Sequence, residues 1–404
     1  MQAIKEFSDH FIPKSGAVPF FSSILVWGIG AGCFTAVLNN YLAEVRGVDE
    51  FQRGLLEFFR EMPGLLLVFI LALMHKKAEW KILRIGTLIS LAGVAGLLLS
   101  ADKAVITLLI MIWSTGEHIL MPVRSTIAMH VAKAGRIGES LGVVTGAMNA
   151  GNVIGSATVA AIFFAGIGWF GIADKVVLYN IVWVLICLLL FASFLCTLFC
   201  KIDVKDVKRP RLYYNRKYGK FYVLELFYGA RKQIFITFAP YVLILNYGMD
   251  TTTMALLVGV CALVNIFCAP LIGKLTDRIG YRNIMIFDTV VLFFVCITYG
   301  YANRMFTYSV ACAVVCVNFL LDAVISTTSM ATSMYVRDIS DSAEEVTATL
   351  TTGISINHLI SILAALAGGW VWQKFGVGVL FSFSAVMALA NSAFAMLIPR
   401  KQET

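Results

Sequence analysis

Charged side chains inside long apolar runs are the residues of this sequence that are most able to do chemistry. The run at 54–74 contains EFFREMPG, in which Glu57, Arg60 and Glu61 are spaced by three and four residues. That spacing places the three side chains on one face of a helix. An ionisable group at such depth costs about 3 kcal/mol or more, so it normally faces a cavity or another charge and indicates function.

The two acids of this group outnumber its one base. One carboxylate of Glu57 and Glu61 could therefore bind and release a proton at accessible pH. The alternative is a structural ion network that holds helices together. Pro63 and Gly64 follow directly and should weaken or kink the helix.

A second charged group lies in the run at 104–130, where Glu117 and His118 are followed by Arg124. Consecutive helical residues point about 100° apart, so only one of Glu117 and His118 should face a cavity. We expect it to be Glu117, which shares a stripe of the helix with Arg124. A desolvated carboxylate suits a cycle that binds a proton in one state and loses it in another. His118 alone is more typical of a hydrogen-bonded core residue.

The second half of the chain carries its own charged and polar residues at depth. Arg231 and Lys232 lie halfway along the run at 221–247, and Asp322 lies deep in the run at 305–335. Arg231 could pair with Asp322 or hold an anionic group of a substrate. Two adjacent cations cannot share one partner, so Lys232 should point elsewhere.

These positions define two sets of candidates. Glu225 and Asp288 belong to neither, because they lie near the ends of their runs and are expected at the membrane interface. The candidates for proton coupling are Glu57, Glu61, Glu117 and Asp322. The candidates for substrate binding are Arg60, His118, Arg124, Arg231, Lys232, Asn357 and His358.

Composition shows what must position these residues. Of 404 residues, 59% are hydrophobic and 14% are charged, and the mean hydropathy is +0.83. A soluble chain cannot bury that much apolar surface. A helix of about 20 residues crosses a hydrocarbon layer of about 30 Å. Twelve such apolar runs predict an all-α membrane protein, at 18–43, 54–74, 82–99, 104–130, 140–168, 176–199, 221–247, 253–274, 284–302, 305–335, 346–372 and 376–398.

The basic residues indicate the orientation. An even number of spans puts both termini on one side, whose loops carry 22 of the 32 Lys and Arg residues. The external side has six: Arg46, Arg53, Lys103, Lys175, Arg304 and Lys374. By the positive-inside rule both termini are cytoplasmic, and the membrane is the cytoplasmic (plasma) membrane. The formal net charge of +8 is then mostly a topology signal, so we expect no nucleic-acid partner. The first 17 residues contain no apolar core of a cleaved signal peptide.

A polar connector at 200–220 with eight basic residues divides the spans into two groups of six, at 1–199 and 221–404. The segments 73–80 and 275–282 resemble each other weakly and occupy equivalent places in the two groups. Duplication predicts two pseudo-symmetric six-helix bundles, and transporters built from such repeats place their substrate site between them. We expect a monomer.

The segment GKLTDRIGYR, between the eighth and ninth predicted spans, resembles the major facilitator superfamily signature G-x-L-x-D-R-x-G-x-R. Its glycines permit a tight turn, Asp277 can accept hydrogen bonds at a helix N-terminus, and the arginines keep the loop cytoplasmic. The resemblance implies the fold of that superfamily and a gating role for this loop. The gating candidates are Gly273, Asp277, Arg278, Gly280 and Arg282.

In that superfamily spans one, four, seven and ten line the central cavity, which favours Glu117, Arg231 and Asp322. The glycines of span five, Gly142, Gly151 and Gly155, also resemble the start of a pattern found in its drug/proton antiporters, although Ser156 replaces the expected proline. The alternative is close helix packing, which would use these glycines and Gly146.

The function expected from these features is secondary transport of a small organic solute by alternating access, coupled to protons and exporting by antiport. The alternatives are a proton-coupled importer or exchanger of an anionic metabolite, a passive uniporter or lipid flippase, and a signalling scaffold. Motifs of hydrolases and of P-loop proteins are absent from the sequence, so we expect no enzyme and no cofactor. The nine cysteines form no Cys-x-x-Cys, and we interpret them as small core residues rather than metal ligands.

Overall fold

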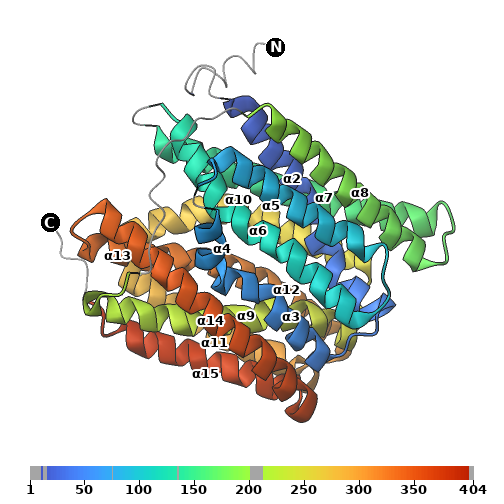
Figure 1. Ribbon diagram of the computed structural model, residues 1–404. Helices are drawn as coiled ribbons and strands as arrows, with labels where there is room; N and C mark the ends of the chain where they lie inside the picture. The colour runs from blue at the N-terminus through green and yellow to red at the C-terminus, as the bar shows by residue number, and fades with distance from the viewer. Residues whose placement is uncertain (1–10, 12–15, 75, 134–135, 201–212, 400–404) are drawn as a thin grey trace. The chain divides into compact units, whose positions relative to one another are not determined.

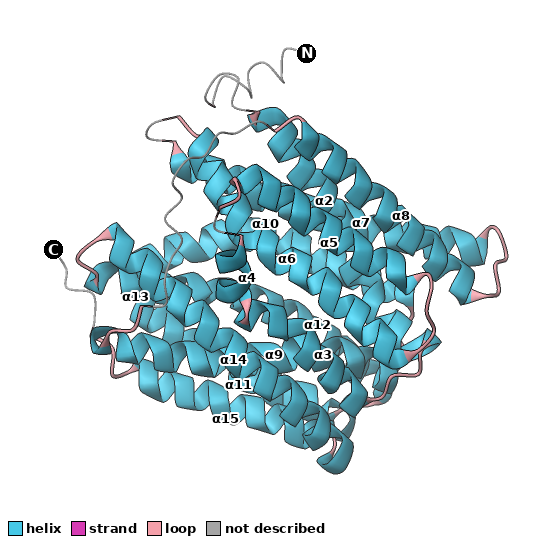
Figure 2. Ribbon diagram, viewed as in Figure 1, coloured by secondary structure: helices cyan, strands magenta, loops and turns pink. Residues whose placement is uncertain are grey.

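The computed structural model describes residue 11 and residues 16–74, 76–133, 136–200 and 213–399, and these are helical almost throughout (Figures 1 and 2). Ten of the helices are long and apolar enough to cross a membrane. The helices account for all twelve predicted spans, and most of their ends lie within five residues of the predicted ends. The twelve-span, all-α prediction is therefore confirmed.

The helices follow one another in this order: α2 (Ala17–Asn40), continued by a π-helical turn (Tyr41–Val45), α3 (Glu50–Leu65), α4 (Leu67–Leu73), α5 (Glu79–Leu97), α6 (Lys103–Val131), α7 (Ile137–Gly168), α8 (Lys175–Leu198), α9 (Gly219–Tyr247), α10 (Thr251–Ile279), α11 (Tyr281–Met305), α12 (Tyr308–Ser326), α13 (Met330–Ile339), α14 (Ala343–Phe375) and α15 (Val377–Ala395). The second span thus consists of α3 and α4, and the tenth of α12 and α13.

The second span is interrupted at Leu66, whose φ of −84° and ψ of 0° lie outside the helical region. Pro63 lies inside α3 and has no N–H with which to continue the helical hydrogen bonds. Gly64 adds backbone freedom next to it. The predicted weakening of this helix is confirmed.

Contacts divide the chain into two compact units. We call them unit 1, which comprises residues 1–47, 66–209 and 250–263, and unit 2, which comprises residues 48–65, 210–249 and 264–404. Helix α3 packs within unit 2, mainly against α14 and also against α9. The predicted division into 1–199 and 221–404 stays a prediction, and most of the predicted connector lies outside the described residues.

Helices α2 and α7 form a close contact within unit 1, and two glycines of α7 make it. A Cβ atom added to Gly151 would lie 2.5 Å from the carbonyl carbon of Gly28, and one added to Gly155 would lie 2.6 Å from the nitrogen of Cys33. The packing interpretation therefore holds for Gly151 and Gly155. It is wrong for Gly142 and Gly146, since no described atom lies within 4 Å of a Cβ added there.

Helix α3 approaches α14 in the same way within unit 2. A Cβ atom on Gly54 would overlap the carbonyl oxygen of Ala365 and lie 3.1 Å from the Cα of Gly369. Because Gly54 and Gly369 carry no side chain at this crossing, the two backbones can come close together. This contact holds the charged face of α3 against α14 and α9.

Candidate functional site

The charged residues of α3 form a continuous ion-pair chain. Glu57, which is fully buried, accepts from Arg53 Nη1 at 2.7 Å and from Arg60 Nη2 at 2.5 Å. The same Arg60 nitrogen lies 2.6 Å from Glu61 Oε1. The spacing of three and four residues along one helix produces this arrangement.

Two further helices of unit 2 complete the chain. From α9, Gln233 Nε2 donates to Glu57 Oε1 at 2.9 Å. From α14, His358 Nδ1 lies 3.0 Å from Glu61 Oε2. We call these six residues the α3 network: Arg53, Glu57, Arg60, Glu61, Gln233 and His358.

The charge balance of the α3 network differs from the one predicted. Arg53 was counted among the bases outside the membrane, but α3 begins at Glu50, and Arg53 is 2% exposed and paired with Glu57. Two guanidinium groups therefore balance two carboxylates, and the predicted excess of acid is wrong. A proton added at the contact of Glu61 and His358 takes the network from neutral to a charge of +1.

Arg231 lies in a second buried cluster of unit 2, and its ion-pair partner is not the predicted one. Arg231 Nη2 is 3.7 Å from Asp288 Oδ2, which also accepts a hydrogen bond from Thr328 Oγ1. Only 8% of Asp288 is exposed, and its expected position near the membrane interface stays a prediction. Asp322 attracts Arg231 electrostatically but makes no ion pair with it within 4.0 Å.

Three polar atoms of this cluster are buried without a hydrogen-bond partner in the described part of the chain: Asp288 Oδ1, Asp322 Oδ1 and Arg231 Nε. Lys232 does not point away from its neighbour. Its ammonium and the Arg231 guanidinium lie 5.9 Å and 4.9 Å from the centre of the same Tyr228 ring. An aromatic ring attracts nearby cations, so Tyr228 is a neighbour that both side chains share.

Asn357 has a different partner from its neighbour His358. Its Nδ2 donates to Glu225 Oε2 at 3.3 Å, and Thr332 Oγ1 donates to Glu225 Oε1 at 3.3 Å. Glu225 is half-buried, and its expected position at the membrane interface stays a prediction. Asn357 is thus tied to Glu225 rather than to the α3 network.

The charged group of α6 lies within unit 1. The Arg124 guanidinium is 3.8 Å from the centre of the Trp27 ring, and its Nη1 is 3.5 Å from Met148 Sδ. Glu117 is half-buried and acts on Arg124 electrostatically. His118 is buried, with Nδ1 2.8 Å from the Ser114 carbonyl oxygen, as a hydrogen-bonded core histidine would be.

The gating segment lies where α10 ends and α11 begins. Gly280, with φ of +83°, is the single residue between them, which explains why a glycine is needed there. Arg282 Nη2 donates to the Met396 carbonyl oxygen at 2.7 Å. No side chain caps α11 in the described structure, and Asp277 is exposed, so Asp277 does not cap that helix. Its gating role stays a prediction.

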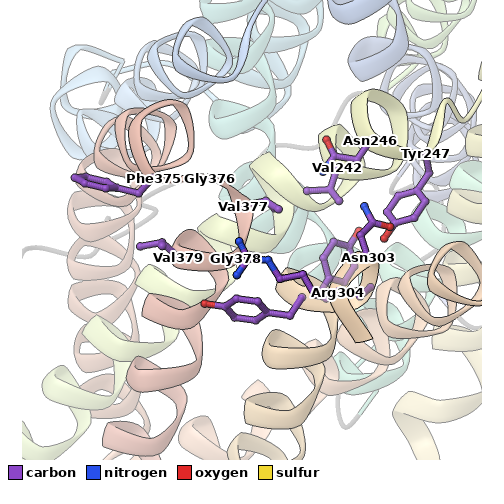
Figure 3. Close-up of a pocket in the computed structure, with 14 residues that line it drawn as sticks. Val242, Asn246, Tyr247, Asn303, Arg304, Phe375, Gly376, Val377, Gly378 and Val379 are labelled. Carbon is purple, nitrogen blue, oxygen red and sulfur yellow. The ribbon is translucent and has the colours of Figure 1, made fainter. Parts of the chain in front are cut away.

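A cavity of about 250 Å³ in unit 2 was not foreseen from the sequence (Figure 3). It lies where α9 and α11 end and α15 begins, and its lining includes Asn246, Tyr247, Asn303 and Arg304. None of the predicted site residues lines it. Arg304 was counted only as a base of an external loop, and no spacing in the sequence joins it to Tyr247.

Comparisons with known proteins agree with the fold. The sequence profile described as Major Facilitator Superfamily matches residues 20–334 and, in a second match, residues 221–404. A comparison with curated proteins gives no match. Among solved structures, a mutant of the nucleoside transporter NupG has a TM-score of 0.77 at 13% identity, over 95% of this chain and 99% of that chain.

Two other transporters are similar at the same identity, 13%. A D-xylose-proton symporter has a TM-score of 0.71 and covers 96% of this chain and 99% of its own. A mutant of the peptide transporter POT, in complex with sulfate, has a TM-score of 0.73 and covers 95% of this chain and 94% of its own. These likenesses show the fold, and the profile match spans most of the chain. The chain therefore belongs to the Major Facilitator Superfamily and is a membrane-embedded secondary transporter of small solutes.

Proposed function

We propose that this transporter couples the movement of its solute to protons through the contact of Glu61 and His358. The observation that carries the proposal is the α3 network, in which buried charges from α3 meet polar side chains of α9 and α14. Ionisable residues inside membrane proteins normally serve a pathway or a relay.

The charge balance supports this location for the proton. Arg53 and Arg60 already compensate the two carboxylates, so the network without an added proton is neutral. Histidine changes its charge near neutral pH, and a carboxylate beside it can share the proton. The proton therefore belongs to the Glu61 and His358 pair rather than to either residue alone.

The remaining candidates keep narrower proposed roles. Glu117 and Asp322 are proposed as further proton-binding groups, since each acts on a buried arginine without an ion pair within 4.0 Å in the part of the chain described. Arg60 and Glu57 are proposed to hold the network together. The residues proposed near the solute are His118, Arg124, Arg231, Lys232, Asn357 and His358.

The direction is proposed as export by antiport. The resemblance of Gly142, Gly151 and Gly155 to the antiporter pattern supports it, and helix packing within the described residues does not account for Gly142. Uptake or exchange of an anionic metabolite is the second candidate, and the buried Arg124 and Arg231 favour it. The shared fold of the D-xylose-proton symporter is compatible with either proton-coupled direction. We also propose that Arg278 and Arg282 take part in gating. The protein is proposed to be a monomer in the cytoplasmic membrane, with both termini in the cytoplasm.

Proteoliposomes that contain a pH-sensitive dye test the coupling. A panel of solutes is added outside, and solute-dependent proton movement is recorded with and without an imposed pH gradient. We expect at least one solute to drive proton movement in the wild type. Glu61→Gln and His358→Gln should abolish that movement while the same solute still crosses the membrane.

Glu225→Gln is the matched control, because Glu225 is another carboxyl of unit 2 but accepts hydrogen bonds from Asn357 and Thr332. It should keep the proton movement. Solute transport that proceeds in the wild type without any proton movement contradicts the proposed coupling. Proton movement that survives in both Glu61→Gln and His358→Gln contradicts its location.

A further inference from the structure

Arg124 is a buried cation whose charge no described carboxylate compensates at contact distance. The residue is 5% exposed, and no carboxylate oxygen of the described residues lies within 4.0 Å of its nitrogens. Its guanidinium lies 3.8 Å from the centre of the Trp27 ring, and its Nη1 lies 3.5 Å from Met148 Sδ. A ring face and a thioether are weak partners for a guanidinium, which has five N–H donors.

Glu117 does not fill this role. It precedes Arg124 by seven residues on α6, which is about 10 Å along the helix axis. Glu117 attracts Arg124 electrostatically, but the described residues show no hydrogen bond and no ion pair within 4.0 Å between them. Arg53, Arg60 and Arg231 each have a carboxylate within 4.0 Å, so Arg124 differs from the other buried arginines.

A second unsatisfied donor lies beside Arg124. The indole Nε1 of Trp27 is buried and has no hydrogen-bond partner among the described residues, although Trp27 is the ring on which Arg124 lies. Buried donors are nearly always paired, and an exception calls for a ligand or another explanation. Trp27 Nε1 thus has no acceptor, and the hydrogen-bond acceptor that Arg124 Nη1 reaches is a thioether. Both groups are donors, so a stronger acceptor, rather than a further donor, is what this place would take.

We propose that Arg124 binds the anionic group of the transported solute, which is therefore a soluble organic anion with a carboxylate or a phosphate. A guanidinium over an aromatic ring still presents N–H groups at its edge, and these match planar, two-oxygen acceptors. The proposal rests on the transporter function, and it names the substrate class. It does not depend on proton coupling.

Calorimetric titration of the purified full-length protein in detergent tests the proposal. The probes are benzoate and succinate, each compared with its uncharged amide, benzamide and succinamide, and inorganic phosphate. At least one of the three anions should bind, and a binding carboxylate should bind at least about 10-fold more tightly than its amide, as expected for hydrogen bonds to a charged group. Arg124→Gln should lose that preference.

Three further variants separate charge from structure. Arg124→Lys should retain part of the binding, because it keeps the charge but loses the planar fork. Glu117→Gln should strengthen it, since a competing negative charge is removed. Arg84→Lys is the matched control: Arg84 also lies over a tryptophan of unit 1, Trp80, at 4.2 Å, but donates to carbonyl oxygens of Thr197 and Leu198.

The anion preference should persist in nanodiscs of uncharged phosphatidylcholine and should not weaken when phosphatidylglycerol is added. Loss of binding on adding that lipid would assign the site to a lipid headgroup and overturn the solute proposal. Three other results would also overturn the solute proposal. The amides could bind as tightly as the acids, none of the three anions could bind, or Arg124→Gln could bind the anions with unchanged affinity. None of those results would contradict the proposed proton coupling through Glu61 and His358, which is tested separately.

Discussion

Gln233 Nε2 donates a hydrogen bond of 2.9 Å to Glu57 Oε1, although 176 residues separate them. The bond joins α9 to the carboxylate that already accepts from Arg53 and Arg60. Glu57 thus receives hydrogen bonds from two guanidinium groups and one amide, and it is fully buried. A buried carboxylate needs that many donors to remain ionised inside a membrane protein.

Glu57→Leu should destabilise the protein strongly, by about 3–5 kcal/mol, because it removes the carboxylate that compensates two buried arginines. Gln233→Leu should cost only about 1 kcal/mol, since Glu57 keeps both of its ion pairs. Thermal unfolding in detergent measures both. Equal losses for the two variants would show that the ion pairs with Arg53 and Arg60 contribute little.

Gly54→Ala should cost about 1–3 kcal/mol, because its Cβ would overlap the Ala365 carbonyl oxygen and force α3 away from α14. Gly142→Ala is the control, because its Cβ would meet no described atom within 4 Å and alanine favours the helix by up to about 1 kcal/mol. The unfolding temperatures of the two variants should move in opposite directions. A stabilised Gly54→Ala would mean that α3 and α14 pack less closely than described.

Arg231→Gln should destabilise the protein by about 3 kcal/mol or more, since it leaves Asp288 and Asp322 buried without the cation that attracts both. Adding Asp288→Asn should restore more of the loss than adding Asp322→Asn, because Arg231 is within ion-pair distance of Asp288 only. Double-mutant cycles of unfolding free energy measure the two couplings. A larger coupling with Asp322 would favour the pairing predicted from the sequence over the one in the structure.

Lys217 gives a pH dependence outside the membrane spans. Its Nζ donates to Asp341 Oδ2 at 2.7 Å, and this hydrogen bond raises the pKa of the Lys217 ammonium above its usual value. A raised pKa in the folded state stabilises the protein below the unfolded-state pKa, and the gain is lost as pH rises through the folded-state pKa. The wild type should therefore unfold at a slightly higher temperature than Asp341→Asn near neutral pH.

That difference between the wild type and Asp341→Asn should vanish in strongly alkaline buffer, once Lys217 is deprotonated. Unfolding temperatures measured across a series of pH values follow it. A difference that persists unchanged at high pH would mean that Asp341 stabilises the protein by some route other than Lys217.

Sequence reasoning was most successful where one helix determines the answer. The face shared by Glu57, Arg60 and Glu61 follows from helical spacing, and the break at Leu66 follows from the preceding Pro63 and Gly64. The apolar runs predicted the spans because each must cross the same thickness of hydrocarbon.

Partners on other helices could not be predicted in the same way. The contact of Glu61 with His358 depends on how α3 packs against α14. That packing depends in turn on Gly54, where the backbone of α3 comes close to the backbone of α14. Arg53 was misplaced for a related reason. It was counted in an external loop because the predicted span begins at residue 54, whereas α3 begins at Glu50 and neighbouring residues bury Arg53.

The aromatic residues around Arg124 have an optical consequence. Trp27 and Trp113 are stacked with ring centres 5.4 Å apart, Phe34 stacks on Trp113 at 4.3 Å, and Arg124 lies over Trp27. An indole next to a positive charge emits at a wavelength that depends on that charge. A bound anion that neutralises Arg124 would therefore shift the emission of Trp27, one of seven tryptophans in the chain, so the protein carries its own fluorescent reporter.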